Sequence, residues 1–215
     1  MKRMLAVLLL LVLTASAALA ETYAVGQTVY FGRYEQDNNP DNGPEPIEWT
    51  VISLIDLTAA GKGKSALLIS RYILDCRPYG CDPNRVTWHT SGLRKWLNGE
   101  FRDAAFTPEE LEQISVVAFT PHKKAPSEDR DDWLYVLGKH EAEKFFPTDA
   151  ERAATLTPWA EAQGAIKAWW LYSPNDILTD AHIVGAKGNL WRATGSYVNE
   201  STIGVRPCLR LKMDD

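Results

Sequence analysis

Aromatic and polar side chains that could form a binding site are concentrated in the last third of the 215-residue chain. The candidate ligand-binding residues are Tyr172, Asn175, Asp176, Trp191, Arg192 and Asn199. The two aromatic rings could provide apolar contact, because exposed Trp and Tyr faces stack on sugars and other ring-bearing ligands. The four polar side chains could add hydrogen bonds, and a few polar groups on an apolar floor are the usual composition of a ligand pocket.

Catalytic residues are not indicated by any spacing in the chain. The four histidines share no metal-ligand spacing, and His140 is followed by Lys144 where a zinc protease motif needs a second His. The nucleophile elbow Gly-x-Ser-x-Gly does not occur. Acidic side chains acting as a general acid and base would still permit an enzyme of the cell envelope that acts on glycosylated or sulfated material.

One loop has a partial resemblance to a calcium site. Residues 37–43 and Glu48 place oxygen-bearing side chains at positions 1, 3, 5 and 12 of a calcium loop. Asn42 stands where that loop needs Gly, and three prolines interrupt the frame. A plain turn is therefore the preferred interpretation, no metal site or cofactor is expected, and calcium is kept as the weaker alternative.

The three cysteines are Cys76, Cys81 and Cys208. Cys76 and Cys81 flank a turn-forming Arg-Pro-Tyr-Gly sequence, so a short disulfide between them is possible in an oxidising compartment. Such a small loop would stabilise the fold by only about 2 kcal/mol. Cys208 lies in an apolar segment and is expected to be a buried hydrophobic residue.

The N-terminus has the pattern of a secretory signal peptide. Lys2 and Arg3 precede an apolar run, and Ala18-Leu19-Ala20 has the form of a cleavage site. We therefore expect residues 1–20 to be removed and residues 21–215 to form a single domain that is secreted or periplasmic, with no stable membrane span. The full chain has 23 basic and 28 acidic residues, and cleavage removes two of the basic ones. The resulting net charge of −7 argues against nucleic-acid binding.

Strands and short helices are expected throughout residues 21–215, which gives an α+β fold with twisted antiparallel sheets. Residues rich in Val, Ile, Leu and aromatics predict strands, namely at 28–34, 47–57, 65–70, 133–137, 168–173, 181–186, 189–194 and 204–212. Thr58 to Lys64 predicts a hairpin loop. Thr90-Ser91 predicts a helix start, with the helix ending at Gly99, and two further helices are expected near residues 139–146 and 158–163.

The best-marked helix begins after Thr107. Thr107 is placed as the N-cap, Pro108 as the first helical residue and Glu110 as the partner in a capping box. Phe106 and Leu111 have the spacing of a hydrophobic staple. This signature predicts a helix with an architectural role.

Several large side chains are assigned to the framework rather than to the site. Trp169 and Trp170 occupy an expected strand, and large aromatics in strands are usually buried. Arg206 precedes Pro207 near the C-terminus, where its five donors could hold loops together. The β unit of residues 167–212 is expected to present its connecting loops on one rim.

Stretches along most of residues 21–215 resemble the exported bacterial domain-of-unknown-function family 6273. The matching segments are Phe31 to Asn39, Glu45 to Trp49, Ala66 to Ser70, Leu74 to Cys76, Val86 to Trp88, Leu93 to Asn98, Trp169 to Leu171, Ser173-Pro174 and Val205 to Pro207. Two positions depart from that family, since Tyr172 stands where Arg is usual and Cys208 where a small residue is usual. The first departure puts in question any ligand contact that the family's Arg makes.

The closing arrangement of a Trp-rich strand, a hairpin and a strand with Arg resembles the C-type-lectin-like fold of the formylglycine-generating enzymes. That resemblance implies a fold and not a function. The enzymes use a closely spaced cysteine pair in the C-terminal core, and this chain has only Cys208 there. The sequence therefore favours a non-catalytic binding module for an extracellular glycan, peptide or protein, with a cell-envelope enzyme or a structural surface protein without a small-molecule site as alternatives.

Overall fold

Two mainly antiparallel sheets and a small two-stranded ladder form the framework in the computed structural model, which describes residues 22–80, 86–118, 131–174, 179–190 and 195–213. The first sheet has the order β1-β2-β3-β11 and the second β4-β10-β7-β8-β9, in which only the β10–β7 pair is parallel. The strands of the first sheet are β1 (Thr28–Tyr34), β2 (Glu45–Asp56), β3 (Lys64–Ser70) and β11 (Cys208–Met213). Those of the second are β4 (Asp75–Cys76), β7 (Ile166–Pro174), β8 (Asp180–Val184), β9 (Ser196–Tyr197) and β10 (Ile203–Val205).

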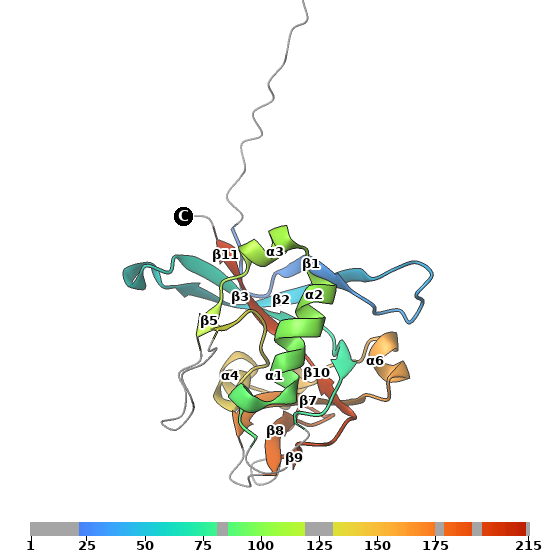
Figure 1. The fold of residues 1–215 in the computed structure, drawn as a ribbon. Helices are drawn as coiled ribbons and strands as arrows, with labels where there is room; N and C mark the ends of the chain where they lie inside the picture. The colour runs from blue at the N-terminus through green and yellow to red at the C-terminus, as the bar shows by residue number, and fades with distance from the viewer. Residues whose placement is uncertain (1–21, 81–85, 119–130, 175–178, 191–194, 214–215) are drawn as a thin grey trace, which may run out of the picture.

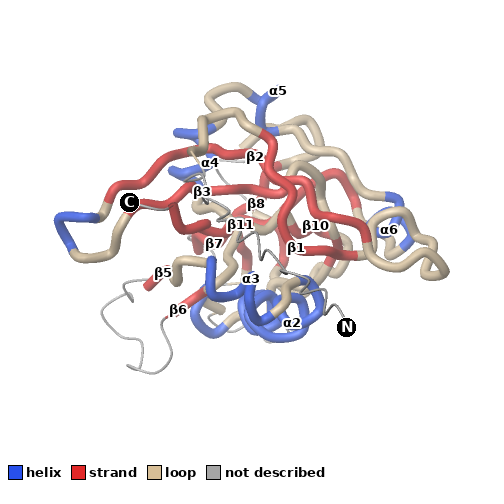
Figure 2. The backbone as a smooth tube through the Cα atoms, turned by 90° about the horizontal axis from the view of Figure 1, so that it is seen from above, coloured by secondary structure: helices blue, strands red, loops and turns tan. Residues whose placement is uncertain are grey.

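Short helices lie at the periphery of the strands (Figure 2). They are α1 (Gly92–Trp96), α2 (Arg102–Ala105), α3 (Pro108–Gln113), α4 (Lys139–Phe145), α5 (Asp149–Arg152) and α6 (Pro158–Ala162). Two 3-10 turns are η1 (Thr58–Ala60) and η2 (Trp88–Thr90), and β5 (Val117–Ala118) pairs with β6 (Asp131–Asp132). This mixture confirms the predicted α+β class. No helix in the described part of the chain is long and apolar enough to cross a membrane.

The helix predicted to end at Gly99 continues to Ala105. A π-helical turn, η3 (Leu97–Phe101), joins α1 to α2, and the continuous helix runs from the second sheet toward the first (Figure 1). Glycine costs about 1 kcal/mol in a helix interior relative to alanine. Leu97 and Phe101 are 0% and 1% exposed, so the burial of these flanking side chains outweighs that cost.

The predicted strand at residues 204–212 is two strands in different sheets. β10 belongs to the second sheet and β11 to the first, and the chain crosses between them at Arg206-Pro207. Pro207 has no N–H for a ladder, and its carbonyl instead accepts a hydrogen bond from the Ser70 amide at 2.9 Å. Within residues 167–212, β7 to β10 therefore share the second sheet, and β11 leaves it to join the first.

One other predicted strand is shorter than expected, and another is only partly described. In residues 133–137 the extended pairing is limited to a bridge between Tyr135 and Cys208, and in residues 189–194 the described part contributes only a bridge between Leu190 and Val184. The hairpin between β2 and β3 agrees with the prediction and contains η1.

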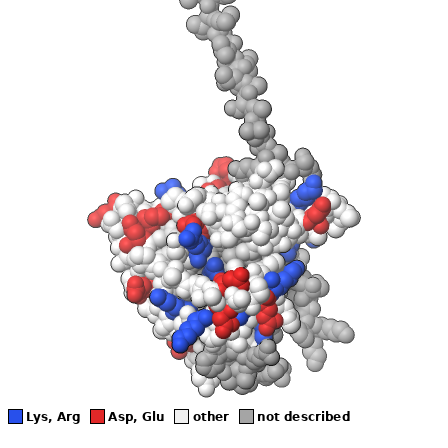
Figure 3. All heavy atoms as spheres, turned by 180° about the vertical axis from the view of Figure 1, so that it is seen from behind, with Lys and Arg blue, Asp and Glu red and all other residues white. Residues whose placement is uncertain are grey.

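One apolar core extends between the sheets. Trp49, Trp169 and Trp170 are 0% exposed, and Cys208 is buried as predicted. The Arg206 guanidinium lies 5.3 Å from the Trp169 ring and 5.4 Å from the Phe146 ring. On the face opposite to that of Figure 1, acidic and basic side chains are interspersed (Figure 3).

Candidate functional site

A cavity of about 270 Å³ lies where β4, α6 and the end of β1 come together. Its lining includes Tyr34, Asp75, Cys76, Arg77, Trp159, Gln163 and Ser201. We call this cavity the Arg77 pocket. It combines aromatic rings with a guanidinium, a carboxylate and polar rim groups, which is the composition expected of a small-ligand site.

The backbone of Arg77 is fixed from two sides. Its amide donates to the Ile203 carbonyl at 3.3 Å, and its carbonyl accepts a hydrogen bond from the Trp170 indole at 2.8 Å. β4, which precedes it, pairs with β10 through Cys76 and Gly204. A Cβ atom at Gly204 would lie 2.4 Å from Ile73, so the close approach of the strands that carry the pocket requires glycine there.

The Asp75 carboxylate organises one wall of the pocket. It accepts a hydrogen bond from the Tyr34 hydroxyl at 2.5 Å and another from the Cys76 amide at 2.7 Å. Burial, followed by the negative charge of Asp75, raises the pKa of Tyr34 well above its usual value, and the indole of Trp159 opposes the shift. Tyr34 is therefore a neutral donor at physiological pH.

The Arg77 guanidinium forms the opposite charge in the pocket. It stacks on the Trp96 ring, with 4.6 Å between the guanidinium carbon and the ring centroid. Its Nε atom is buried and has no hydrogen-bond partner among the residues that the structure describes. A buried donor without a partner costs free energy, so the described part of the chain leaves this guanidinium incompletely satisfied.

The Cys76 thiol is held in its protonated form. Burial and the nearby Asp75 charge raise its pKa, and the thiol approaches the Gln163 carbonyl at 3.5 Å. Because the thiolate is the nucleophilic species, this environment does not activate Cys76 for covalent chemistry. Cys81 lies outside the described residues, so its pairing with Cys76 stays a prediction.

A larger cavity of about 370 Å³ is lined by Glu143, Asp149, Arg152 and Asn189, among others. The Arg152 guanidinium is already engaged there, because it donates to the Phe146 and Gly188 carbonyls and pairs with Asp149. This arginine ties the α5 region to the hairpin after β8. The larger cavity is thus a poorer candidate than the Arg77 pocket.

The residues predicted from the sequence are only partly described. Asn175, Asp176, Trp191 and Arg192 lie outside the described residues, so their role stays a prediction. Asn199 is exposed in the loop between β9 and β10, two residues before Ser201 of the pocket rim.

Tyr172 is half-buried, and its ring packs on the Gly138 backbone. The ring centroid lies 6.3 Å from that of Trp88. Burial, with the Glu141 charge as a further cause, raises the pKa of Tyr172 to about 12. This environment favours a packing role for part of the ring.

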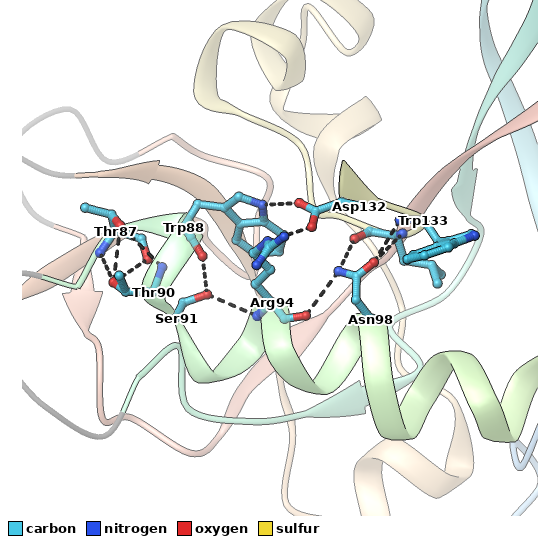
Figure 4. Close-up of polar contacts among 9 residues, drawn as sticks. Thr87, Trp88, Thr90, Ser91, Arg94, Asn98, Asp132 and Trp133 are labelled. Atoms are coloured by element: carbon cyan, nitrogen blue, oxygen red, sulfur yellow. Dashed lines mark hydrogen bonds and ion pairs between the residues drawn. The ribbon is translucent and has the colours of Figure 1, made fainter. Parts of the chain in front are cut away.

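A buried polar network under α1 connects it to β6 (Figure 4). The Arg94 guanidinium lies 2.6 Å from the Asp132 carboxylate, which also accepts a hydrogen bond from the Trp88 indole at 2.8 Å. Asn98 donates to the carbonyls of Arg94 and Leu134 and accepts from the amides of Trp133 and Leu134. The Asp132 side chain is 0% exposed, so we interpret this network as structural.

The loop that resembles a calcium site in part has a different arrangement of acidic groups. Glu48, expected at position 12, lies 2.5 Å from Arg71. The carboxylates of Glu35, Asp37 and Glu45 are close together instead, and each accepts a backbone amide of the loop. These hydrogen bonds are those of a polar turn. Calcium binding stays the weaker alternative, and it is untested.

Comparison with protein-family models shows that residues 63–213 match a domain of unknown function, DUF6273. No curated protein and no solved structure matches the chain. The matched region contains β4, α6 and most of the Arg77 pocket, with Tyr34 outside it.

The pocket residues were not found from the sequence. Arg77 is part of the turn between two cysteines, and Tyr34 and Asp75 are 41 residues apart. The one local signal is that Asp75 and Arg77 are charged residues that directly follow the apolar segment Ile73-Leu74. Charged side chains at the end of a buried segment are candidates for a site, because scaffolds position functional groups at such ends.

Proposed function

The chain belongs to the DUF6273 family, and we propose that it is an exported, non-catalytic binding module that recognises an extracellular glycan, peptide or protein partner. The observation that carries the proposal is the Arg77 pocket, in which a stacked guanidinium, two aromatic side chains and a carboxylate line one cavity of about 270 Å³. That volume is near the lower limit of ligand pockets and suits one ring or one side chain of a larger ligand.

Binding is favoured over catalysis by the state of the reactive groups in the pocket. The Cys76 thiol is protonated, and the Asp75 carboxylate is engaged by Tyr34 and by its neighbouring amide. Glycoside hydrolysis needs two carboxyl groups facing each other across the scissile bond. Asp75 is the one carboxylate among the described residues that line this pocket.

The loop between β9 and β10 gives a connection to the C-terminal site proposed from the sequence. Ser201 forms part of the pocket rim, and Asn199 lies exposed two residues earlier. A ligand that fills the Arg77 pocket and extends past Ser201 would contact this loop. The proposed function therefore combines the pocket with contacts from the C-terminal loops.

A blocking variant tests the proposal without removing a buried side chain. The mature chain is screened on a glycan and peptide array, and the affinity for each ligand found is measured by calorimetry with the wild type and with Ser201→Trp. Because Ser201 is exposed, the indole should be tolerated and should obstruct the pocket. We expect the affinity to fall by about tenfold or more.

Ala59→Trp is the matched control, because it adds the same side chain at an exposed position of the β2–β3 hairpin. This control should leave the affinity unchanged. Equal affinity for the wild type and Ser201→Trp would show that the ligand binds elsewhere.

A further inference from the structure

The Arg77 guanidinium is a positive charge that the described part of the chain leaves without a counter-ion. No carboxylate of a described residue lies within 4.0 Å of it, although five other ion pairs occur in the same part of the structure. Asp75 is the nearest acidic residue along the chain, and its oxygens accept hydrogen bonds from Tyr34 and the Cys76 amide. Half-burial of a charged group is unfavourable unless a partner of opposite charge compensates it.

The position of the guanidinium is pre-set for binding. Trp96 supports one face of it, and the backbone of Arg77 is held by Ile203 and Trp170. A planar guanidinium presents its donors in a fork that matches a carboxylate. A side chain that is already supported loses little conformational entropy when it pairs with a ligand.

The remaining lining of the pocket suits a ring that carries hydroxyl groups. Trp159 and Tyr34 contribute aromatic surface, and Gln163 and Ser201 contribute side chains that can both donate and accept hydrogen bonds. Such a lining is unnecessary for a simple inorganic anion. It matches a sugar ring with several hydroxyls beside its charged group.

We propose that the Arg77 pocket binds a carboxylated sugar, a uronic acid unit of an extracellular glycan, whose carboxylate pairs with Arg77. This inference rests on the proposed binding function and specifies its ligand class. The chain carries more acidic than basic residues, so long-range attraction of an anionic glycan is not expected. Recognition of the carboxylate must therefore come from the local contact with Arg77.

Calorimetry with defined trisaccharides tests the inference on the mature chain. The probes are trigalacturonate and triglucuronate, their methyl esters, and the corresponding neutral trisaccharides. We expect at least one free acid to bind, and its ester and neutral counterpart to bind about tenfold to a hundredfold more weakly, because one charge-assisted contact is lost. The ester comparison uses the unaltered protein, so it does not depend on the folding of any variant.

Protein variants locate the contact. Arg77→Gln should weaken binding of the free acid by about tenfold to a hundredfold and leave binding of the ester unchanged. Arg71→Gln is the matched control, because Arg71 also lies over an aromatic ring, 5.6 Å from the centroid of Tyr72, but does not line the pocket. This control should bind the free acid as the wild type does.

Each contrary result overturns the inference. The uronic acid assignment is wrong if acid, ester and neutral sugar bind equally, if Arg77→Gln binds the acid as well as the wild type does, or if no trisaccharide binds at millimolar concentration. A neutral glycan or a peptide that binds and is obstructed by Ser201→Trp would overturn it while leaving the proposed binding function intact. If no trisaccharide binds and no ligand from the array is obstructed by Ser201→Trp, the proposed binding function of this pocket is wrong as well.

Discussion

The buried ion pair under α1 gives a prediction whose magnitude follows from the geometry. Asp132→Asn removes the negative charge 2.6 Å from Arg94, and the Asn oxygen can still accept the Trp88 indole hydrogen bond. The Arg94 side chain is 9% exposed, so its charge loses a carboxylate partner in a buried environment. Breaking a buried pair in this way costs about 3 to 5 kcal/mol. We expect the lower end, about 3 kcal/mol in the free energy of unfolding, because the indole contact is kept.

Urea unfolding of Asp132→Asn, Arg94→Met and the double variant measures this cost and the coupling. The double variant should lose at least about 2 kcal/mol less than the sum of the single variants, because an apolar replacement of the pair leaves no buried charge. Asp103→Asn is the control, since Asp103 pairs with Arg102 at 2.7 Å but is 63% exposed, and it should cause little change. The reasoning would be refuted if the changes in the free energy of unfolding of the two single variants added up to that of the double variant. It would also be refuted if Asp132→Asn lowered that free energy as little as the control does.

Two further predictions concern packing and pH. Gly138→Ala should lower the free energy of unfolding by about 1 to 3 kcal/mol, because its Cβ would lie 2.6 Å from the Tyr172 ring. Gly99→Ala has open space around the new Cβ and should raise the free energy of unfolding by up to about 1 kcal/mol. Thermal unfolding compares the two variants. The raised pKa of Tyr34 means that the folded state holds this proton more tightly than the unfolded state does, so stability is complete below the ordinary tyrosine pKa and falls above about pH 10. Tyr34→Phe should lower stability at neutral pH by about 1.5 to 3 kcal/mol through the lost bond to Asp75, and should flatten the alkaline decline of the urea midpoint; an unchanged slope would contradict this.

Local signals in the sequence predicted local structure well. The capping box at Thr107 forms as expected, since its hydroxyl accepts the Glu110 amide at 3.2 Å and Glu110 accepts the Thr107 amide at 2.9 Å. Residues three apart meet in any helix start, so their types are sufficient for the prediction. The second oxygen of Glu110 accepts the Gly32 amide of β1 at 3.2 Å, a contact over 78 residues that the capping pattern cannot indicate.

Contacts over long sequence distances were not predictable for the same reason. Trp88 and Asp132 are 44 residues apart, and no spacing rule pairs them. The helix through Gly99 was misjudged because its continuation depends on burial of Leu97 and Phe101 against other elements. Propensity is a weak signal that tertiary packing overrides.

Two arginines with the same local sequence illustrate where the sequence stops being informative. Arg77-Pro78 and Arg206-Pro207 both follow short strands of the second sheet. Arg206 lies between the Trp169 and Phe146 rings and donates to the Ser70 carbonyl at 2.8 Å, and burial lowers its pKa to about 10, so it stays charged at neutral pH.

Arg77 is also stacked on a tryptophan, but it borders a cavity with polar groups on its other side. The packing of other elements decides which arginine is closed in the core and which faces a ligand-sized space. A charged residue beside proline is therefore evidence for a fixed backbone in both cases, and evidence for binding only where the fold leaves room beside its charge.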